Sequence, residues 1–158
     1  MQVLIMRHGN AFSKAKSDSE RSLTDRGRNE SSIIARWLSY KVKEINFVLV
    51  SPYLRARQTF NILQEYLVLP ESYKVLPELI PSGDSSIVNC YLKSLSKEGL
   101  KQILLISHLP LICSLLVDLC QVEQPLIFST SSVANIDIDT VSGNNKLLWQ
   151  IEPIQLLS

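Results

Sequence analysis

Side chains that handle phosphate stand directly after short apolar runs of this chain. His8 and His108 are its only histidines, and each follows such a run. Arg7 stands beside His8, and Arg55 comes five residues after a third run. A neutral imidazole can act as a nucleophile, and a guanidinium group donates paired hydrogen bonds to phosphoryl oxygens. Together the four residues predict a site for phosphoryl transfer.

The predicted chemistry is attack by His8 on a phosphoryl group. Charge spreads over the phosphoryl oxygens during transfer, so the site must supply fixed positive donors such as Arg7 and Arg55. Nearby cations disfavour protonation of His8 and help to keep it neutral near pH 7. We expect His108 to donate a hydrogen bond to the phosphoryl oxygens. Two histidines without a clustered carboxylate or cysteine do not form an ordinary zinc set, so we predict no metal.

Three apolar runs must position these residues, at 3–6, 47–50 and 103–106. They alternate with four apolar stripes of helical spacing, within 33–38, 56–67, 87–95 and 111–119. This alternation is typical of an α/β domain with a mainly parallel sheet. Ligands of such sheets bind beyond the carboxyl ends of the strands. We therefore expect the three strand ends to lie side by side, with the two histidines and two arginines in one pocket.

The C-terminal part of the chain has a different period. Apolar and polar residues alternate over 134–139 and again over 147–151, and Ser142-Gly143-Asn144-Asn145 lies between them. This pattern predicts a β-hairpin. The predicted fold class is therefore α/β, a three-layer α/β/α sandwich with a mainly parallel central sheet and an appended C-terminal β-hairpin. The polar stretch from Ser13 to Ser22 is the one long loop predicted before the hairpin.

Size and charge limit the classes of function. The chain has 158 residues, of which 46% are hydrophobic and 20% charged, as expected of a single domain spanning 1–158. A net charge of +1 gives no overall field that would attract nucleic acid or an anionic membrane. The apolar run at the start is too short for a signal peptide or a membrane span, so we expect a cytoplasmic protein.

The cysteines predict no further chemistry. Cys90, Cys113 and Cys120 include no Cys-x-x-Cys pair, which argues against a disulfide framework or a zinc site. We interpret all three as buried thiols.

Three motifs resemble those of a known family. Leu4-Ile5-Met6-Arg7-His8-Gly9 is similar to the Arg-His-Gly signature of the histidine phosphatase (phosphoglycerate mutase-like) superfamily, in which the histidine is transiently phosphorylated. The segment 51–59, Ser-Pro-Tyr-Leu-Arg-Ala-Arg-Gln-Thr, resembles the second motif of the superfamily, and Ser107-His108 resembles the third. The resemblance implies that Arg7, His8, Arg55 and His108 form the catalytic set.

Further stretches resemble the phosphohistidine phosphatases within this superfamily, over Met1 to about Trp149. They are Met1-Gln2-Val3, Arg21-Ser22-Leu23-Thr24 with Gly27, Leu76-Pro77-Glu78-Leu79 with Gly83-Asp84, and 107–111. The resemblance implies removal of phosphate from the histidine of a phosphotransfer (HPt) domain in a sensor-kinase phosphorelay, without metal or organic cofactor. A phosphocarrier of a phosphotransferase system is an alternative target.

The same resemblance indicates residues around the catalytic set. We predict that Gly9, Asn10 and Arg21 bind substrate; Asn10 stands where an aspartate is common in such chains. Glu78 lies where larger members of the superfamily carry a proton donor, so it is a candidate acid. An imidazole leaves more easily than an alkoxide, so a phosphohistidine substrate needs such an acid less.

Two other functions stay open. One is a phosphatase for small phosphoesters or a sugar phosphate mutase, although the short chain leaves little sequence for a lid over a small substrate. The other is a phosphate-recognising module without turnover, which would need the arginines but not both histidines. Trapping a phosphorylated His8 would distinguish an enzyme from such a module.

Overall fold

A mixed β-sheet forms the centre of the computed structural model, which describes residues 1–121 and 127–157. Within these residues the sheet has six strands in the order β3-β2-β4-β1-β5-β6. Their bounds are β1 Gln2–Arg7, β2 Phe47–Val50, β3 Lys74–Val75, β4 Gln102–Ser107, β5 Val133–Asp137 and β6 Lys146–Ile151. The first four in this spatial order run parallel, whereas β5 and β6 are antiparallel and form the predicted hairpin.

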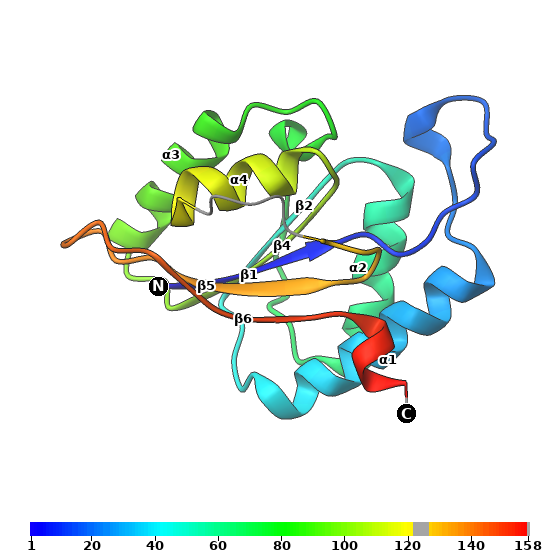
Figure 1. The fold of residues 1–158 in the computed structure, drawn as a ribbon. Helices are drawn as coiled ribbons and strands as arrows, with labels where there is room; N and C mark the ends of the chain where they lie inside the picture. Colours follow the sequence, from blue (N-terminus) through cyan, green and yellow to red (C-terminus); the bar gives the residue numbers. More distant parts are fainter. Residues whose placement is uncertain (122–126, 158) are drawn as a thin grey trace.

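Helices cover both faces of the sheet (Figure 1). Alternate residues of β1 point to opposite faces, so Leu4 and Met6 pack with α1 (Asp25–Lys41) and α2 (Leu54–Tyr66). Val3 and Ile5 pack instead with α3 (Ser85–Lys97) and α4 (Leu111–Cys120). The predicted three-layer α/β/α sandwich is confirmed. No helix in the described residues is both long and apolar enough to cross a membrane.

Short elements outside the apolar runs were not predicted. Three 3₁₀ turns, η1 (Asp18–Glu20), η2 (Pro77–Leu79) and η3 (Pro153–Leu156), lie in the described residues. The first of them lies inside the predicted loop from Ser13 to Ser22. The loop leads into α1, whose N-cap is Thr24: its hydroxyl accepts a hydrogen bond from the amide of Gly27 at 3.0 Å. This cap fixes where the loop ends and α1 begins.

The prediction of three buried cysteines is wrong. Cys90 is exposed, and Cys113 and Cys120 are half-buried. Cys90 lies two positions from both Val88 and Leu92, which are buried in α3. Residues two apart on a helix point to different sides, so the face that buries Val88 and Leu92 turns Cys90 to solvent.

Candidate active site

The carboxyl ends of three parallel strands meet at one edge of the sheet. Strand β4 lies between β1 and β2, and Met6 and Val50 both pair with Ile106. The residues that follow these strands are therefore neighbours. The ring centres of His8 and His108 lie 4.9 Å apart, which confirms the predicted juxtaposition.

His8 is held in one tautomer. Its Nδ1 lies 2.7 Å from the backbone oxygen of Gly9. Because a carbonyl oxygen can only accept, Nδ1 carries the proton and Nε2 keeps its lone pair. That lone pair accepts a hydrogen bond from Nε of Arg55 at 3.3 Å. Nε2 is therefore the nitrogen able to act as a nucleophile.

The surroundings of His8 keep its ring neutral. Only 5% of the residue is exposed. Burial lowers the pKa of His8 to about 3; the hydrogen bond with Gly9 opposes this, and the charges of Arg55, Arg7 and Arg21 add to it. A cationic imidazole is costly in such a place. At pH 7 the lone pair on Nε2 is therefore present.

His108 lies against His8 and is 1% exposed. Its Nε2 is 2.7 Å from the hydroxyl of Ser51. That hydroxyl already accepts from the amide of Tyr53 at 3.2 Å, so its own proton can be donated to Nε2. In that arrangement Nδ1 of His108 carries the ring proton; Nδ1 is buried and has no hydrogen-bond partner in the described part of the chain. Burial, with the nearby His8 and arginines, lowers the pKa of His108 to about 2.

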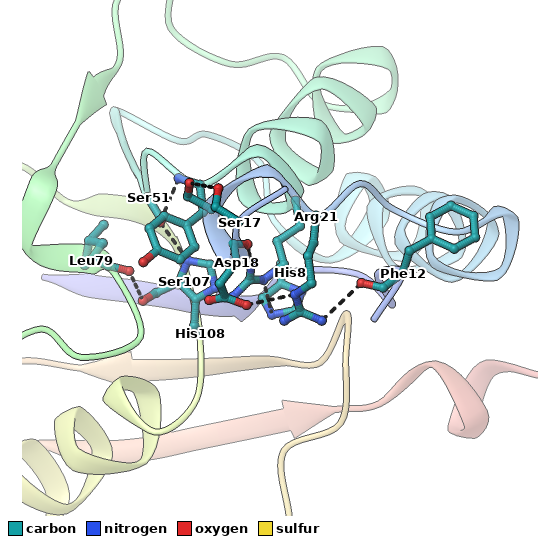
Figure 2. Close-up of polar contacts among 12 residues, drawn as sticks. His8, Phe12, Ser17, Asp18, Arg21, Ser51, Leu79, Ser107 and His108 are labelled. Carbon is teal, nitrogen blue, oxygen red and sulfur yellow. Dashed lines mark hydrogen bonds and ion pairs between the residues drawn. The ribbon is translucent and has the colours of Figure 1, made fainter. Parts of the chain in front are cut away.

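Arg55 joins α2 to the loop that follows β1. The residue is 2% exposed, and its guanidinium carbon lies 5.0 Å from the ring centre of Tyr53. Its Nη1 donates to the backbone oxygen of Asp18 at 2.6 Å, and its Nη2 donates to the Asp18 carboxylate at 3.2 Å. The same carboxylate accepts from Nε of Arg21 at 2.9 Å (Figure 2). Two guanidinium groups thus share one carboxylate.

His8 and Arg55 open into a pocket of about 320 Å³, whereas His108 is not among the residues that line it. Three arginines and one carboxylate are among the residues that line it: Arg7, His8, Asn10, Ala11, Asp18, Arg21, Arg55, Pro81, Leu109 and Thr130. The pocket thus has an excess of positive charge and suits an anion. In residues 1–121 and 127–157 no group of three His, Cys, Asp or Glu side chains could hold a metal ion. A larger hollow of about 440 Å³ lies at the opposite end of β1, against Met1 and Gln2, and neither histidine lines it.

Known proteins are similar to this chain in sequence and in fold. Residues 3–80 match the family described as the histidine phosphatase superfamily (branch 1). The chain is 49% identical over 156 residues to the phosphohistidine phosphatase SixA of Escherichia coli (strain K12), covering 99% of this chain and 96% of that protein. The chain belongs to the histidine phosphatase superfamily.

Two further comparisons agree with this membership of the superfamily. A phosphohistidine phosphatase SixA homolog of Haemophilus influenzae is 32% identical over 163 residues, covering 98% of each chain. A solved structure of the protein histidine phosphatase SixA complexed with tungstate matches with a TM-score of 0.94 at 49% identity, over 99% of both chains.

Some of the predicted site residues line the pocket, and others lie behind it. Arg7, Asn10, Arg21 and Arg55 line the pocket with His8, and His108 lies against the His8 ring. Arg7 is fixed by its Nη1, which donates to the backbone oxygen of Phe128 at 2.8 Å. Asn10 accepts a hydrogen bond from the hydroxyl of Thr24 at 2.8 Å.

Gly9 has partners within the protein. Its amide donates to Thr59 at 2.9 Å, and its carbonyl holds His8. A Cβ on Gly9 would lie 2.7 Å from the Ser31 hydroxyl, and a Cβ on Gly27 would lie 2.0 Å from the backbone oxygen of Asn10. The glycine of the Arg-His-Gly motif and Gly27 therefore let the loop after β1 lie directly on α1.

Glu78 does not line the pocket. It lies in η2, and its Oε2 is buried without a hydrogen-bond partner in the residues that the structure describes. The next residue, Leu79, anchors the turn to β4: its backbone oxygen accepts from the Ser107 hydroxyl at 2.7 Å.

Sequence reasoning missed Asp18 and the roles of Ser51 and Tyr53. Ser51 and Tyr53 lie in the second superfamily motif, which could have signalled them, and they orient His108 and Arg55. No motif marks Asp18, because it stands in a polar loop among serines and several charged residues. Its position is set by Arg55, which is 37 residues further along the chain.

Proposed function

We propose that this chain is a protein phosphohistidine phosphatase that works through a phosphorylated His8, with residues 1–158 acting as a single domain. The observation that carries the proposal is the neutral His8 ring, whose Nε2 lone pair faces Arg55 in a pocket lined by three arginines. The 49% identity to a phosphohistidine phosphatase supports the substrate class.

In the first step Nε2 of His8 attacks the phosphorus of the substrate. A bond forms between phosphorus and Nε2, the bond to the substrate imidazole breaks, and its electron pair stays on the leaving nitrogen, which takes a proton from solvent. The guanidinium groups of Arg7 and Arg55 bind the phosphoryl oxygens, and His108, whose ring lies against that of His8, is the proposed further donor. They stabilise the charge that spreads over these oxygens during transfer.

In the second step water attacks the phosphorus of phospho-His8. The bond to Nε2 breaks, its electron pair returns to His8, and inorganic phosphate leaves. Asn10 and Arg21 contact the substrate at the rim of the pocket, whereas the proposed role of Gly9 is to hold His8 through its carbonyl. Neither step needs a metal or an organic cofactor.

The proposed leaving group is an imidazole. It needs little help from an acid because its own ring equilibrium and solvent can supply the proton. The position of Glu78 outside the pocket lining supports a mechanism without a protein acid at this point.

The proposed partner is the phosphorylated HPt domain of a sensor histidine kinase, with a phosphocarrier of a phosphotransferase system as the second choice. The pocket opens at the edge of the sheet, where Ala11, Pro81 and Leu109 are the apolar residues among those described that line it. Such an opening admits a side chain carried on another protein. Since phosphorelays of this kind signal inside the cell, the proposed place of action is the cytoplasm.

The test is a panel of substrates. The purified chain is mixed with a phosphorylated HPt domain, a phosphorylated phosphocarrier and several small phosphoesters, and phosphate release is followed. We expect release from phosphohistidine proteins and an acid-labile phosphoryl group on His8 in a rapid quench. Release from the phosphoesters alone would favour the small-substrate phosphatase. Binding of phosphorylated partners without any phospho-His8 would favour the module without turnover.

A further inference from the structure

Asp18 takes up the hydrogen-bond donors that a phosphoryl group would need. Its backbone oxygen and its carboxylate accept from both terminal nitrogens of Arg55, at 2.6 and 3.2 Å. Its carboxylate also accepts from Arg21 at 2.9 Å. Among the described residues it is the one carboxylate that lines the pocket, beside three arginines.

The Asp18 carboxylate lies beside the nucleophilic nitrogen. Arg55 donates from Nε to Nε2 of His8 and from Nη2 to the carboxylate of Asp18. These two nitrogens belong to one planar guanidinium group, which can otherwise bind one oxyanion with paired hydrogen bonds. A phosphoryl group bound to Arg55 next to His8 would therefore meet the negative charge of Asp18.

Of the two partners, Asp18 is by far the more exposed to solvent. The side chain of Arg55 is 3% exposed, whereas that of Asp18 is 56% exposed on the turn η1. Slight burial would raise the pKa of the Asp18 carboxyl, but hydrogen bonds and charge from Arg55 and Arg21 hold it below its usual value. The group is therefore an anion at neutral pH. Like charges on one guanidinium group repel each other.

We propose that Asp18 is a displaceable anion that occupies the phosphoryl site of the resting protein and weakens its hold on free phosphate. The inference rests on the proposed function, for which inorganic phosphate is the product. Three guanidinium groups without a counter-charge would retain this product. The return of Asp18 to Arg55 and Arg21 favours its departure, while a protein substrate has further surface contacts with which to displace Asp18.

The size of the effect follows from how often Asp18 occupies Arg55. A binding site that is free for one tenth of the time has its apparent affinity lowered about tenfold. Asp18→Asn removes the charge but keeps the shape of the side chain and the backbone contact with Arg55. We expect it to bind inorganic phosphate about tenfold more tightly than the wild-type chain.

The experiment is a calorimetric titration of the full chain with inorganic phosphate near neutral pH. Glu20→Gln is the matched control, because Glu20 lies in the same turn, is exposed and makes no ion pair in the described part of the chain. It changes the net charge equally and should leave the phosphate Kd within about twofold of wild type. Asp18→Ala should tighten binding as Asp18→Asn does, and Asp18→Glu should stay close to wild type.

The sign of the change decides between two roles of Asp18. If Asp18 only holds Arg55 in place, both neutral variants will bind phosphate more weakly or unchanged, and the proposal is overturned. Equal tightening in Glu20→Gln would also overturn it, since the effect would then come from net charge. Thermal unfolding of each variant shows that it is folded, and Asp18→Ala gives a second neutral variant if Asp18→Asn does not fold.

The titration needs no turnover, so its result is separate from the proposed function. Suppose that the wild-type chain releases no phosphate from any phosphohistidine protein while Asp18→Asn binds phosphate more tightly. The proposed function then fails and the role of Asp18 as a competing anion stands. If the wild-type chain turns over phosphohistidine and Asp18→Asn binds phosphate no more tightly, the proposed function stands and the role of Asp18 fails.

Discussion

His8, His108 and Arg55 are between 1% and 5% exposed, whereas the side chains of Arg21 and Asp18 are 26% and 56% exposed. The buried group stands at strand ends and in the first turn of α2, where the sheet and its helices fix each atom. The exposed pair belongs to the loop between β1 and α1. The buried side of the pocket holds the groups of the proposed chemistry, and the exposed side holds the carboxylate that we propose competes with phosphate.

The largest expected effect lies on the buried side. His8→Ala should abolish phosphate release from a phosphohistidine protein, because it removes the only nucleophile of the proposed mechanism. The fold should persist, since His8 stands at the end of β1 rather than among its core residues. Phosphate release is the measurement, with circular dichroism as the check on folding. Measurable turnover by a clean preparation would rule out the covalent mechanism.

Replacing each of the two arginines that bind Asp18 should lower kcat/KM by different amounts. Arg55→Ala should lower kcat/KM by about two to three decades, or roughly 2 to 4 kcal/mol, as expected when one fixed donor to the transition state is lost. Arg21→Ala should cost about tenfold or less because Arg21 is more exposed and solvent screens it.

Both variants are measured on the same phosphohistidine protein. A larger loss in Arg21→Ala than in Arg55→Ala would contradict the division between the buried and the exposed side of the pocket.

A smaller effect should appear in stability as the pH falls. Burial lowers the pKa of His8 to about 3 and that of His108 to about 2. Below the unfolded value of about 6.5 the unfolded chain takes up these protons first, so stability is full above about pH 6.5 and is lost as the pH falls toward the folded values.

Urea unfolding at pH 7.5 and pH 5.5 measures this loss. The wild-type midpoint should fall between these two pH values, and His8→Ala should lose less over the same interval because one of the two histidines is gone. Equal losses in both proteins would show that His8 does not stay neutral in the folded state.

The smallest expected effect concerns Glu78. Glu78→Gln should barely change kcat/KM on a phosphohistidine protein, because the imidazole needs little help to leave. Because Glu78 does not line the pocket, the change should also leave any weak activity on an alkyl or aryl phosphate nearly unchanged. A loss above about tenfold, or ~1.4 kcal/mol, on the phosphohistidine protein would show that Glu78 is a working acid.

The sequence predicts the buried side of the pocket better than the exposed side, for a physical reason. The runs before Arg7 and Ser107 are continuous and apolar because both faces of β1 and β4 are buried, so the strand ends can be read directly. Strand β3 has only two residues, both exposed, and leaves no such pattern. The contact of Asp18 with Arg55 depends on the tertiary fold alone, and no local sequence pattern predicts it.

The close packing at Gly27 has a consequence for how this chain can vary. A methyl group there would lie 2.0 Å from the backbone oxygen of Asn10. The first turn of α1 therefore packs directly against the segment that carries the Arg-His-Gly motif and fixes its path. In a library of random single substitutions scored for loss of phosphatase activity, changes at Gly27 should rank with those at His8, although Gly27 has no side chain to offer a substrate. A chimera that takes α1 from a distant relative must therefore bring that relative's loop after β1 with it.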